Sequence, residues 1–357
     1  MDKKILGIII VLVLLFGYIG YIRITKKPKV PEKKLSAVLN IYNWEDYFGE
    51  TTLEDFEKEF GVKVNFETYE DEEIMVSAVT SDPSKYDVII ASDDLIRTMG
   101  EKRLLAQIDI ENIPNFKNIG DEFKNPSYDP GNKYSIPYLQ WTTGIAVNRK
   151  YIEETEDSWS ILWNPKYKGK IAMLNNAYEV IGAALKYLGY PLCSTDPVQL
   201  EEAKQLLLEQ EPLLRGYEDT ITIRDDLISE ELWAAHQYGG EAAFAADENE
   251  NVEYILPKEG AAYGVDTFAI PIDAKHKYTA EVFINYILDP KVSAEIANYL
   301  WYANTNEAAA KFTDPEILEE PSIYPPEEVR NRLELYTDIG EVDATYLQIW
   351  AELQRQE

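Results

Sequence analysis

An almost uninterrupted apolar run, YDVIIAS at residues 86–92, limits the possible fold more than any other feature of the sequence. A strand that is apolar on both faces must be covered on both, as in the parallel sheets of α/β proteins. Before this run, residues 52–61 carry apolar side chains at helical spacing and close on Gly61, a typical C-cap residue. Residues 62–69 alternate as a strand does. Strand, helix, strand and helix in succession predict βαβ units, and the fold class is α/β.

The later sequence continues this alternation. Residues 95–108 predict a helix with a break at Gly100, and residues 134–152 predict two extended stretches that could cross between domains. Asp196 followed by proline predicts a helix start, and Asp289 followed by proline predicts a boundary between two helices.

The charge of the chain is strongly negative and unevenly distributed. The net charge is −30, although the first 34 residues carry eight Lys or Arg and only two acids. A nucleic acid would be repelled by the remainder, so nucleic acid is not expected as a partner. A cationic ligand would be attracted, and solubility alone is the competing explanation.

Metal and nucleotide chemistry find little support in the sequence. Cys193 is the single cysteine and His236 and His276 are the only histidines, which excludes an internal disulfide and argues against a Cys/His metal site. His276 lies in a polar stretch and is expected to be a solvated surface residue. The phosphate-binding pattern G-x-x-x-x-G-K-[ST] is missing, so ATP hydrolysis is not expected. We expect no cofactor.

The first residues predict a membrane segment. Residues 5–22 contain no charge and would span about 27 Å as a helix, enough for the hydrocarbon core of a bilayer. The first alanine is Ala37, so the A-x-A spacing of a cleaved signal peptide is missing. We expect residues 1–24 to be an uncleaved anchor, with a cleaved signal as the alternative, and residues 25–35 to be a charged linker.

Aromatic and acidic residues meet where the first predicted strand ends, in the stretch NIYNWEDYF. Trp44, Asp46 and Tyr47 lie there, and Ser92 and Asp94 follow the apolar run in the same way. Open α/β sheets bind ligands at these carboxyl ends. Aromatic faces attract ammonium groups and carboxylates pair with them. The pattern therefore predicts a receptor for an aliphatic amine; ordinary core and solvated surface is the alternative.

From about residue 39 onward the chain resembles the extracytoplasmic substrate-binding proteins of spermidine/putrescine ABC importers. The resemblance rests on the stretches NIYNWEDY, FEKEFGVKVNFETYE, YDVIIAS, YSIPY, GIAVN, SWSILWNPKYKGKIAML, LPKEGAAYGVDTFAIP and FINYILDPKVSAEIANYLWYANTNEAA, which occur in the order of that family.

This resemblance implies a two-lobed periplasmic-binding-protein-like fold of type II, with the ligand enclosed between the lobes. Lobe 1 would comprise residues 36–146 and 266–311, and lobe 2 would comprise residues 147–265 and 312–357. The lobes would close on a polyamine by a hinge motion, and the closed form would dock on ABC permease subunits in the membrane. The chain would be extracytoplasmic, membrane-anchored, monomeric and not an enzyme.

The resemblance also implies the binding residues. They are Trp44, Asp46, Tyr47, Ser92, Asp94, Asn176, Glu179, Tyr238, Asp266 and Tyr336. Trp44 and Tyr47 correspond to stacking rings, Asp46 to a carboxylate, and Glu179 and Asp266 to acids that pair with amines.

Five positions depart from the family pattern. Asp94 replaces a tyrosine, Asn176 an aspartate, Tyr238 a tryptophan, Gly264 a stacking tryptophan and Tyr336 a glutamine. We therefore expect one platform to be lost at residue 264 and the preferred amine to differ in length or chemistry. Three residues also have ordinary structural explanations, since Asp94 could cap a helix that begins at Leu95, Tyr238 could belong to the core and Glu179 could be solvated.

Two other classes of function stay open. A receptor for a sugar, metal ion or amino acid is the first, although an amino-acid receptor would need an arginine placed in the cleft. A membrane-anchored glycosidase with paired carboxylates is the second, with Asp46 and either Glu179 or Asp266 as the pair.

Overall fold

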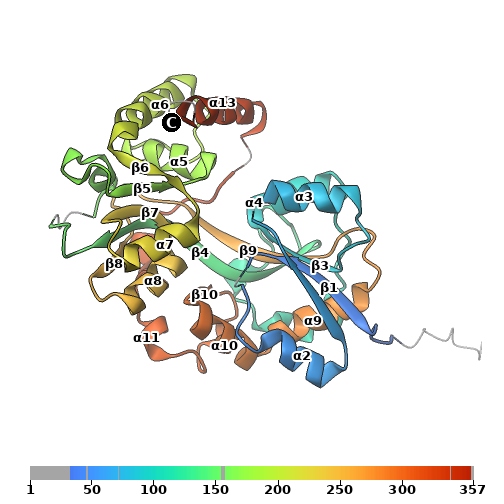
Figure 1. Cartoon of the computed structure of the whole chain (residues 1–357). Helices are drawn as coiled ribbons and strands as arrows, with labels where there is room; N and C mark the ends of the chain where they lie inside the picture. The colour runs from blue at the N-terminus through green and yellow to red at the C-terminus, as the bar shows by residue number, and fades with distance from the viewer. Residues whose placement is uncertain (1–32, 46, 71, 154–156, 338, 355–357) are drawn as a thin grey trace, which may run out of the picture. The chain divides into compact units, whose positions relative to one another are not determined.

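A mixed β-sheet organises the chain from Ser36 onward (Figure 1). The computed structural model describes residues 33–45, 47–70, 72–153, 157–337 and 339–354. Ser36–Glu357 forms one compact unit. Among the described residues, ten strands pair in the order β2-β1-β3-β9-β4-β7-β5-β6, and β8 and β10 both pair with β4.

The strands have the following bounds: β1 (Val38–Asn43), β2 (Lys63–Thr68), β3 (Val88–Ser92), β4 (Ser135–Asn148), β5 (Ile171–Leu174), β6 (Leu214–Glu218), β7 (Ala234–Tyr238), β8 (Val252–Ile255), β9 (Tyr263–Ala269) and β10 (Ala303–Asn304). The α-helices are α2 (Thr52–Phe60), α3 (Glu72–Ser81), α4 (Asp93–Glu101), α5 (Ala177–Tyr187), α6 (Pro197–Gln210), α7 (Thr220–Ile228), α8 (Gly239–Glu248), α9 (Lys277–Ile287), α10 (Pro290–Leu300), α11 (Pro315–Leu318), α12 (Glu327–Arg330) and α13 (Asp343–Leu353).

Short 3-10 helices complete the list: η1 (Ile110–Asn112), η2 (Pro114–Asn118), η3 (Asp121–Phe123), η4 (Trp159–Trp163), η5 (Pro165–Tyr167), η6 (Glu211–Leu213), η7 (Glu307–Ala309) and η8 (Gly340–Val342).

The first half of the sheet contains the predicted βαβ units. β1 lies between β2 and β3 and is parallel to both. Every residue of β3 is buried, as the apolar run predicts, although β3 is antiparallel to β9 on its other side. Gly61 ends α2 in the left-handed conformation and donates its N–H to the carbonyl of Glu57, which confirms the predicted C-cap.

One long strand joins the two halves of the sheet. β4 pairs with β9 through Thr142 and then with β7 from Thr143 onward. The predicted pair of extended stretches is therefore a single 14-residue strand that changes partners midway. Gly144 allows the close approach of β8, because a Cβ at this position would lie 2.5 Å from the carbonyl oxygen of Ile255.

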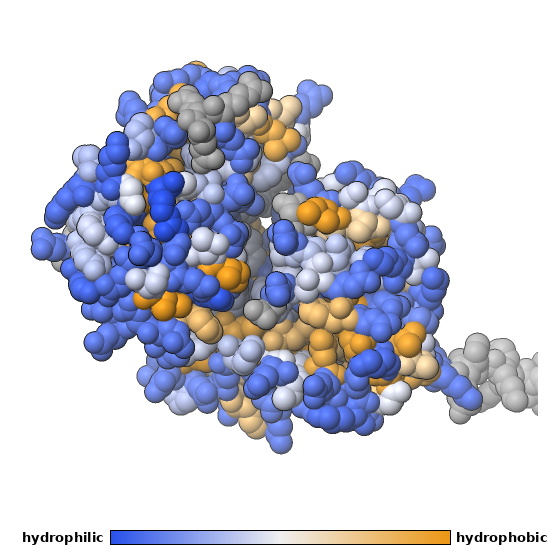
Figure 2. Space-filling view, in the orientation of Figure 1, coloured by the Kyte–Doolittle hydropathy of each residue, from blue (hydrophilic) through white to orange (hydrophobic). Residues whose placement is uncertain are grey.

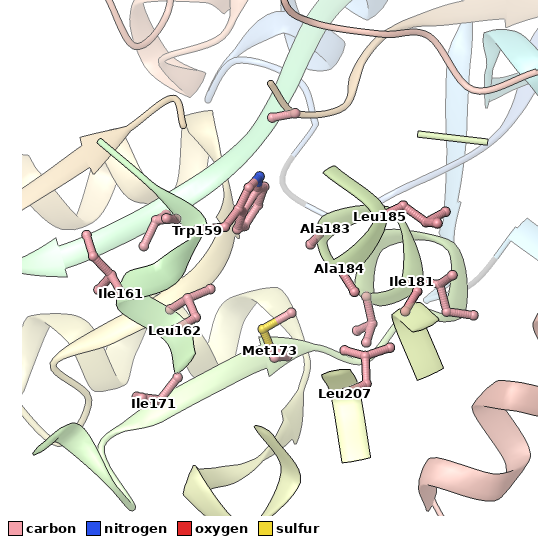
Figure 3. Close-up of a cluster of buried hydrophobic side chains, with 14 of the residues drawn as sticks. Trp159, Ile161, Leu162, Ile171, Met173, Ile181, Ala183, Ala184, Leu185 and Leu207 are labelled. Atoms are coloured by element: carbon pink, nitrogen blue, oxygen red, sulfur yellow. The ribbon is translucent and has the colours of Figure 1, made fainter. Parts of the chain in front are cut away.

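A buried core supports the half of the sheet that contains β5, β6 and β7. Figure 3 shows its apolar side chains gathered from η4, β5, α5 and α6. Trp159 is fully buried and donates its indole N–H to the carbonyl of Gly260 at 2.9 Å. The helix starts predicted at Asp196 and Asp289 are confirmed, since each side chain accepts a hydrogen bond from the backbone of the following helix.

Two local predictions are wrong. The helix expected over residues 95–108 ends at Glu101, because the chain turns at Arg103, which has a φ of 59°. His276 is not a solvated surface residue: its ring nitrogen lies 2.9 Å from the buried Asp87 carboxylate, which also accepts its backbone N–H.

The predicted membrane segment at residues 5–22 lies outside the described residues. Within the part of the chain that the structure describes, no helix has the length and apolarity needed to cross a bilayer.

Candidate functional site

A buried carboxylate, Asp266, lies near the middle of the sheet. It is opposite Ser92 of β3 and Leu139 of β4 in the strand register. The Tyr47 hydroxyl donates a hydrogen bond to it, and the Trp141 side chain forms another. Burial raises the pKa of Asp266 to about 7, despite these two bonds. Loss of hydration therefore dominates the electrostatics of this acid.

A second acid lies close by at the start of α3. The Glu72 carboxylate accepts the backbone N–H and the hydroxyl of Ser92, both at 2.7 Å. Burial, the Asp94 charge and the Asp266 charge raise the pKa of Glu72 to about 8. Asp93, the first residue of α4, is also buried, and its pKa is raised well above the ordinary value. The sequence prediction included neither Glu72 nor Asp93.

We call four of these acids the acidic cluster: Glu72, Asp93, Asp94 and Asp266. The cluster is not balanced by positively charged side chains of the described residues. Among the described residues, no Lys or Arg nitrogen forms an ion pair within 4.0 Å of any of them. Nor do three His, Cys, Asp or Glu side chains of the described residues converge closely enough to hold a metal ion. Two buried carboxylates, Asp93 and Asp266, and the half-buried Glu72 have no cation beside them, which favours a positively charged group from outside the chain.

Aromatic rings surround Asp266. Tyr47 meets Tyr138 and Tyr302 edge to face, with ring centroids 5.8 and 5.7 Å apart. Trp141 meets Tyr238 at 5.7 Å and 83°, and Tyr336 at 6.3 Å and 35°. Trp44 packs on Tyr69 with the centroids 4.4 Å apart. The resemblance predicts that a stacking ring is lost at Gly264. In the structure the indole of Trp141 lies against that glycine and occupies the space beside it.

A further acid comes from the other half of the sheet. Glu179, in the first turn of α5, is buried and lies 3.3 Å from Nε2 of the fully buried His236. It is therefore not solvated on the helix surface. Together with burial, its charge raises the pKa values of Tyr238 and Tyr336 well above normal.

The acids of the two halves act on the same side chains. The negative charge of Glu179 raises the pKa of Tyr238, and so do the charges of Asp266 and Glu72. The charge of Asp94 likewise contributes to the raised pKa of Tyr178 in α5. Figure 2 shows the surface hollowed between the part that carries α5 and α6 and the part that carries α3 and α4. The first turns of α3, α4 and α5 thus carry the acids Glu72, Asp94 and Glu179, whose charges act on tyrosines of this region.

Of the predicted residues, Asn176 has a local structural role and Asp94 does not have the capping role considered for it. The Asn176 side chain is the N-cap of α5 and accepts the N–H groups of Tyr178 and Glu179 at 2.9 and 3.1 Å. Asp94 is exposed and does not cap a helix at Leu95, because α4 begins at Asp93 with Ser92 as its N-cap. Asp46 lies outside the described residues.

A cavity of about 370 Å³ adjoins this region at Trp141. Its wall includes Tyr263, Tyr302, Glu122 and Arg330. Trp141, which lies in this wall, also hydrogen-bonds to Asp266. The cavity and the acidic cluster are therefore neighbours, and the Trp141 indole borders both.

Comparison with known proteins adds a family assignment. Residues 51–324 match the model of a family described as bacterial extracellular solute-binding protein. The spermidine/putrescine-binding periplasmic protein of Salmonella typhimurium is 33% identical over 317 residues, covering 88% of this chain and 91% of that protein. The putrescine-binding periplasmic protein SpuD of Pseudomonas aeruginosa is 32% identical over 323 residues, covering 85% and 88%.

Solved structures show the same similarity. The spermidine/putrescine ABC transporter substrate-binding protein PotD of Streptococcus pneumoniae superposes with a TM-score of 0.80 at 33% identity, covering 90% of this chain and 99% of that one. The Tp0655 lipoprotein of Treponema pallidum gives a TM-score of 0.80 at 28% identity, covering 88% and 99%.

Proposed function

Because the chain belongs to the bacterial extracellular solute-binding protein family, we propose that it binds a polyamine of the spermidine or putrescine type and delivers it to ABC permease subunits. The family consists of receptors, so the chain is a solute receptor and not an enzyme. Its α/β fold is the two-lobed fold of periplasmic binding proteins. The relatives named for polyamines disfavour the sugar, amino-acid and glycosidase alternatives.

The observation that carries the proposal is the acidic cluster. Asp266 is a buried carboxylate and Glu72 a half-buried one, and their pKa values rise to about 7 and about 8. An ammonium group beside them would favour their ionised forms and would replace lost hydration with charge-assisted hydrogen bonds. The rings beside Asp266 suit the methylenes that separate the charges of a polyamine.

We assign the ligand contacts to the ten residues predicted above, with Glu72 added. Asp266 and Glu179 would bind ammonium groups from opposite sides, because the charges of both act on Tyr238. Tyr47 would orient Asp266 through its hydroxyl, and Ser92 would orient Glu72. Asp46 and Trp44 keep the roles that the sequence predicts.

We further propose a type II arrangement with lobe 1 formed by residues 36–146 and 266–311 and lobe 2 by residues 147–265 and 312–357. The partner change in the middle of β4 supports a hinge between such lobes. The protein would act as an extracytoplasmic monomer, and residues 1–24 would anchor it to the membrane, as the uncharged stretch at residues 5–22 suggests.

Calorimetry and thermal shift with a panel of amines test this function. Putrescine, cadaverine, spermidine, spermine and agmatine are compared with 1,4-butanediol, which lacks the charges. At least one amine should bind one to one and raise the melting temperature by mass action, and the diol should do neither. If no amine binds, or if the diol binds as well as putrescine, the proposed function is wrong.

A further inference from the structure

Trp141 and Gly264 form a size-matched pair across two neighbouring strands. They are directly opposite in the antiparallel register of β4 and β9. A Cβ added to Gly264 would lie 2.2 Å from Cζ2 and 2.5 Å from Cε2 of the indole. Gly264 does not have the positive φ that would require glycine for conformational reasons. Glycine is therefore needed here for space, and the indole occupies that space.

The surroundings of the indole are those of a site. It hydrogen-bonds to the Asp266 carboxylate, and the rings of Tyr238 and Tyr336 border it. The side chain is only half-buried, unlike the fully buried Trp159 of the core. It also forms part of the wall of the 370 Å³ cavity. A ring that only filled the core would not combine a buried acid, partial exposure and an open neighbouring space.

We propose that Trp141 is the aromatic platform on which the methylene chain of the ligand lies, next to the ammonium group bound by Asp266. This inference rests on the proposed function. A flat ring fixed beside a carboxylate offers dispersion contact to the methylenes and a cation–π contact to the charge. The hydrogen bond to Asp266 and the contact with Gly264 hold the indole in one orientation. The same indole separates the ligand from the neighbouring cavity and so sets one boundary on ligand length.

Paired substitutions test this role. Trp141→Leu removes the ring, and Trp163→Leu is the matched control, because Trp163 is also half-buried but packs on the core of η4, α5 and α6 and hydrogen-bonds to the Leu206 carbonyl. By calorimetry, Trp141→Leu should weaken putrescine or spermidine binding roughly tenfold, and the control less than twofold. Equal affinities of the two variants would overturn the inference.

If the Trp141→Leu variant does not fold, Trp141→Phe is used instead, because it keeps a smaller aromatic ring at the same position. A smaller ring should retain part of the affinity, with a loss of roughly two- to fivefold. The amine-induced change in tryptophan fluorescence should fall by more than half in this variant, although calorimetry still detects binding. An undiminished fluorescence change would contradict the inference. If the unmodified protein binds no amine at all, the proposed function fails instead, and the two failures are distinguishable.

Discussion

Replacing Asp266 with asparagine should separate ligand binding from folding. The substitution keeps the shape of the side chain and an oxygen that can accept the Tyr47 hydroxyl, but it removes the charge. Asp266 is buried, so an ammonium group bound there would lose a desolvated ionic partner. Such losses cost about 2–4 kcal/mol, which corresponds to roughly 30- to 1000-fold in affinity.

Asp94→Asn is the matched control in the same cluster. Asp94 is exposed, and exposed ion pairs contribute about 0–1 kcal/mol, so this change should weaken binding about fivefold or less. The assay is calorimetric titration of spermidine and putrescine into the two variants at one salt concentration. The reasoning is refuted if the two variants bind with similar affinity.

The stability of the ligand-free variants provides an internal check. Burial raises the pKa of Asp266 to about 7 in the folded chain, from an ordinary value of 3.8. Ionised Asp266 therefore opposes folding above neutral pH, and the asparagine variant should melt at the same temperature or higher at about pH 8. Weak binding by a fully folded variant would identify a ligand contact, whereas a lower melting temperature would indicate a structural role.

The remaining predictions concern pH, Tyr47 and Asn176. Ligand-free stability should decrease as the pH rises from about 4 to about 8, because folding raises the pKa values of Asp266 and Glu72 and the folded chain holds their protons more tightly. Over the upper part of that range amine affinity should increase as both acids ionise; a pH-independent affinity between about pH 6 and pH 8 would contradict this. Tyr47→Phe removes the hydrogen bond to Asp266 and should raise the pKa of Asp266 further, which NMR titration can measure, and should weaken binding at neutral pH by about tenfold. Asn176→Ala removes the N-cap of α5 and should lower the free energy of unfolding by about 1 kcal/mol in urea titration, whereas Asn176→Asp should retain the cap; equal stability of the two variants would argue against the capping role.

The parts of the fold that could be predicted depend on local signals. The apolar run that becomes β3, the glycine that caps α2 and the aspartates that begin α6 and α10 act within a few residues of themselves. β4 was not predicted as one strand, because its continuity depends on two different sets of partners. That information lies in distant parts of the sequence.

The same distinction applies to the site. Asp266 follows from family resemblance, and Tyr47 follows from that resemblance and from the rings at a strand end, whereas Glu72 resembles any acid in the first turn of a helix. Its place in the site becomes visible only when the end of β3 sets Ser92 beside it, where Ser92 donates two hydrogen bonds to its carboxylate. The sequence around Trp141 shows only a residue within a strand. Its role becomes apparent from the register of β4 and β9, which places it opposite Gly264.

A crystal structure of the complex with spermidine or putrescine tests the central claim most directly, through the distance between the ammonium nitrogen and the Asp266 carboxylate. We expect this distance to be about 2.7–3.2 Å, with the methylene chain in contact with the Trp141 indole. An amine bound elsewhere, for example beside Glu122 in the neighbouring cavity, with Asp266 contacting only Tyr47 and Trp141, would contradict the account.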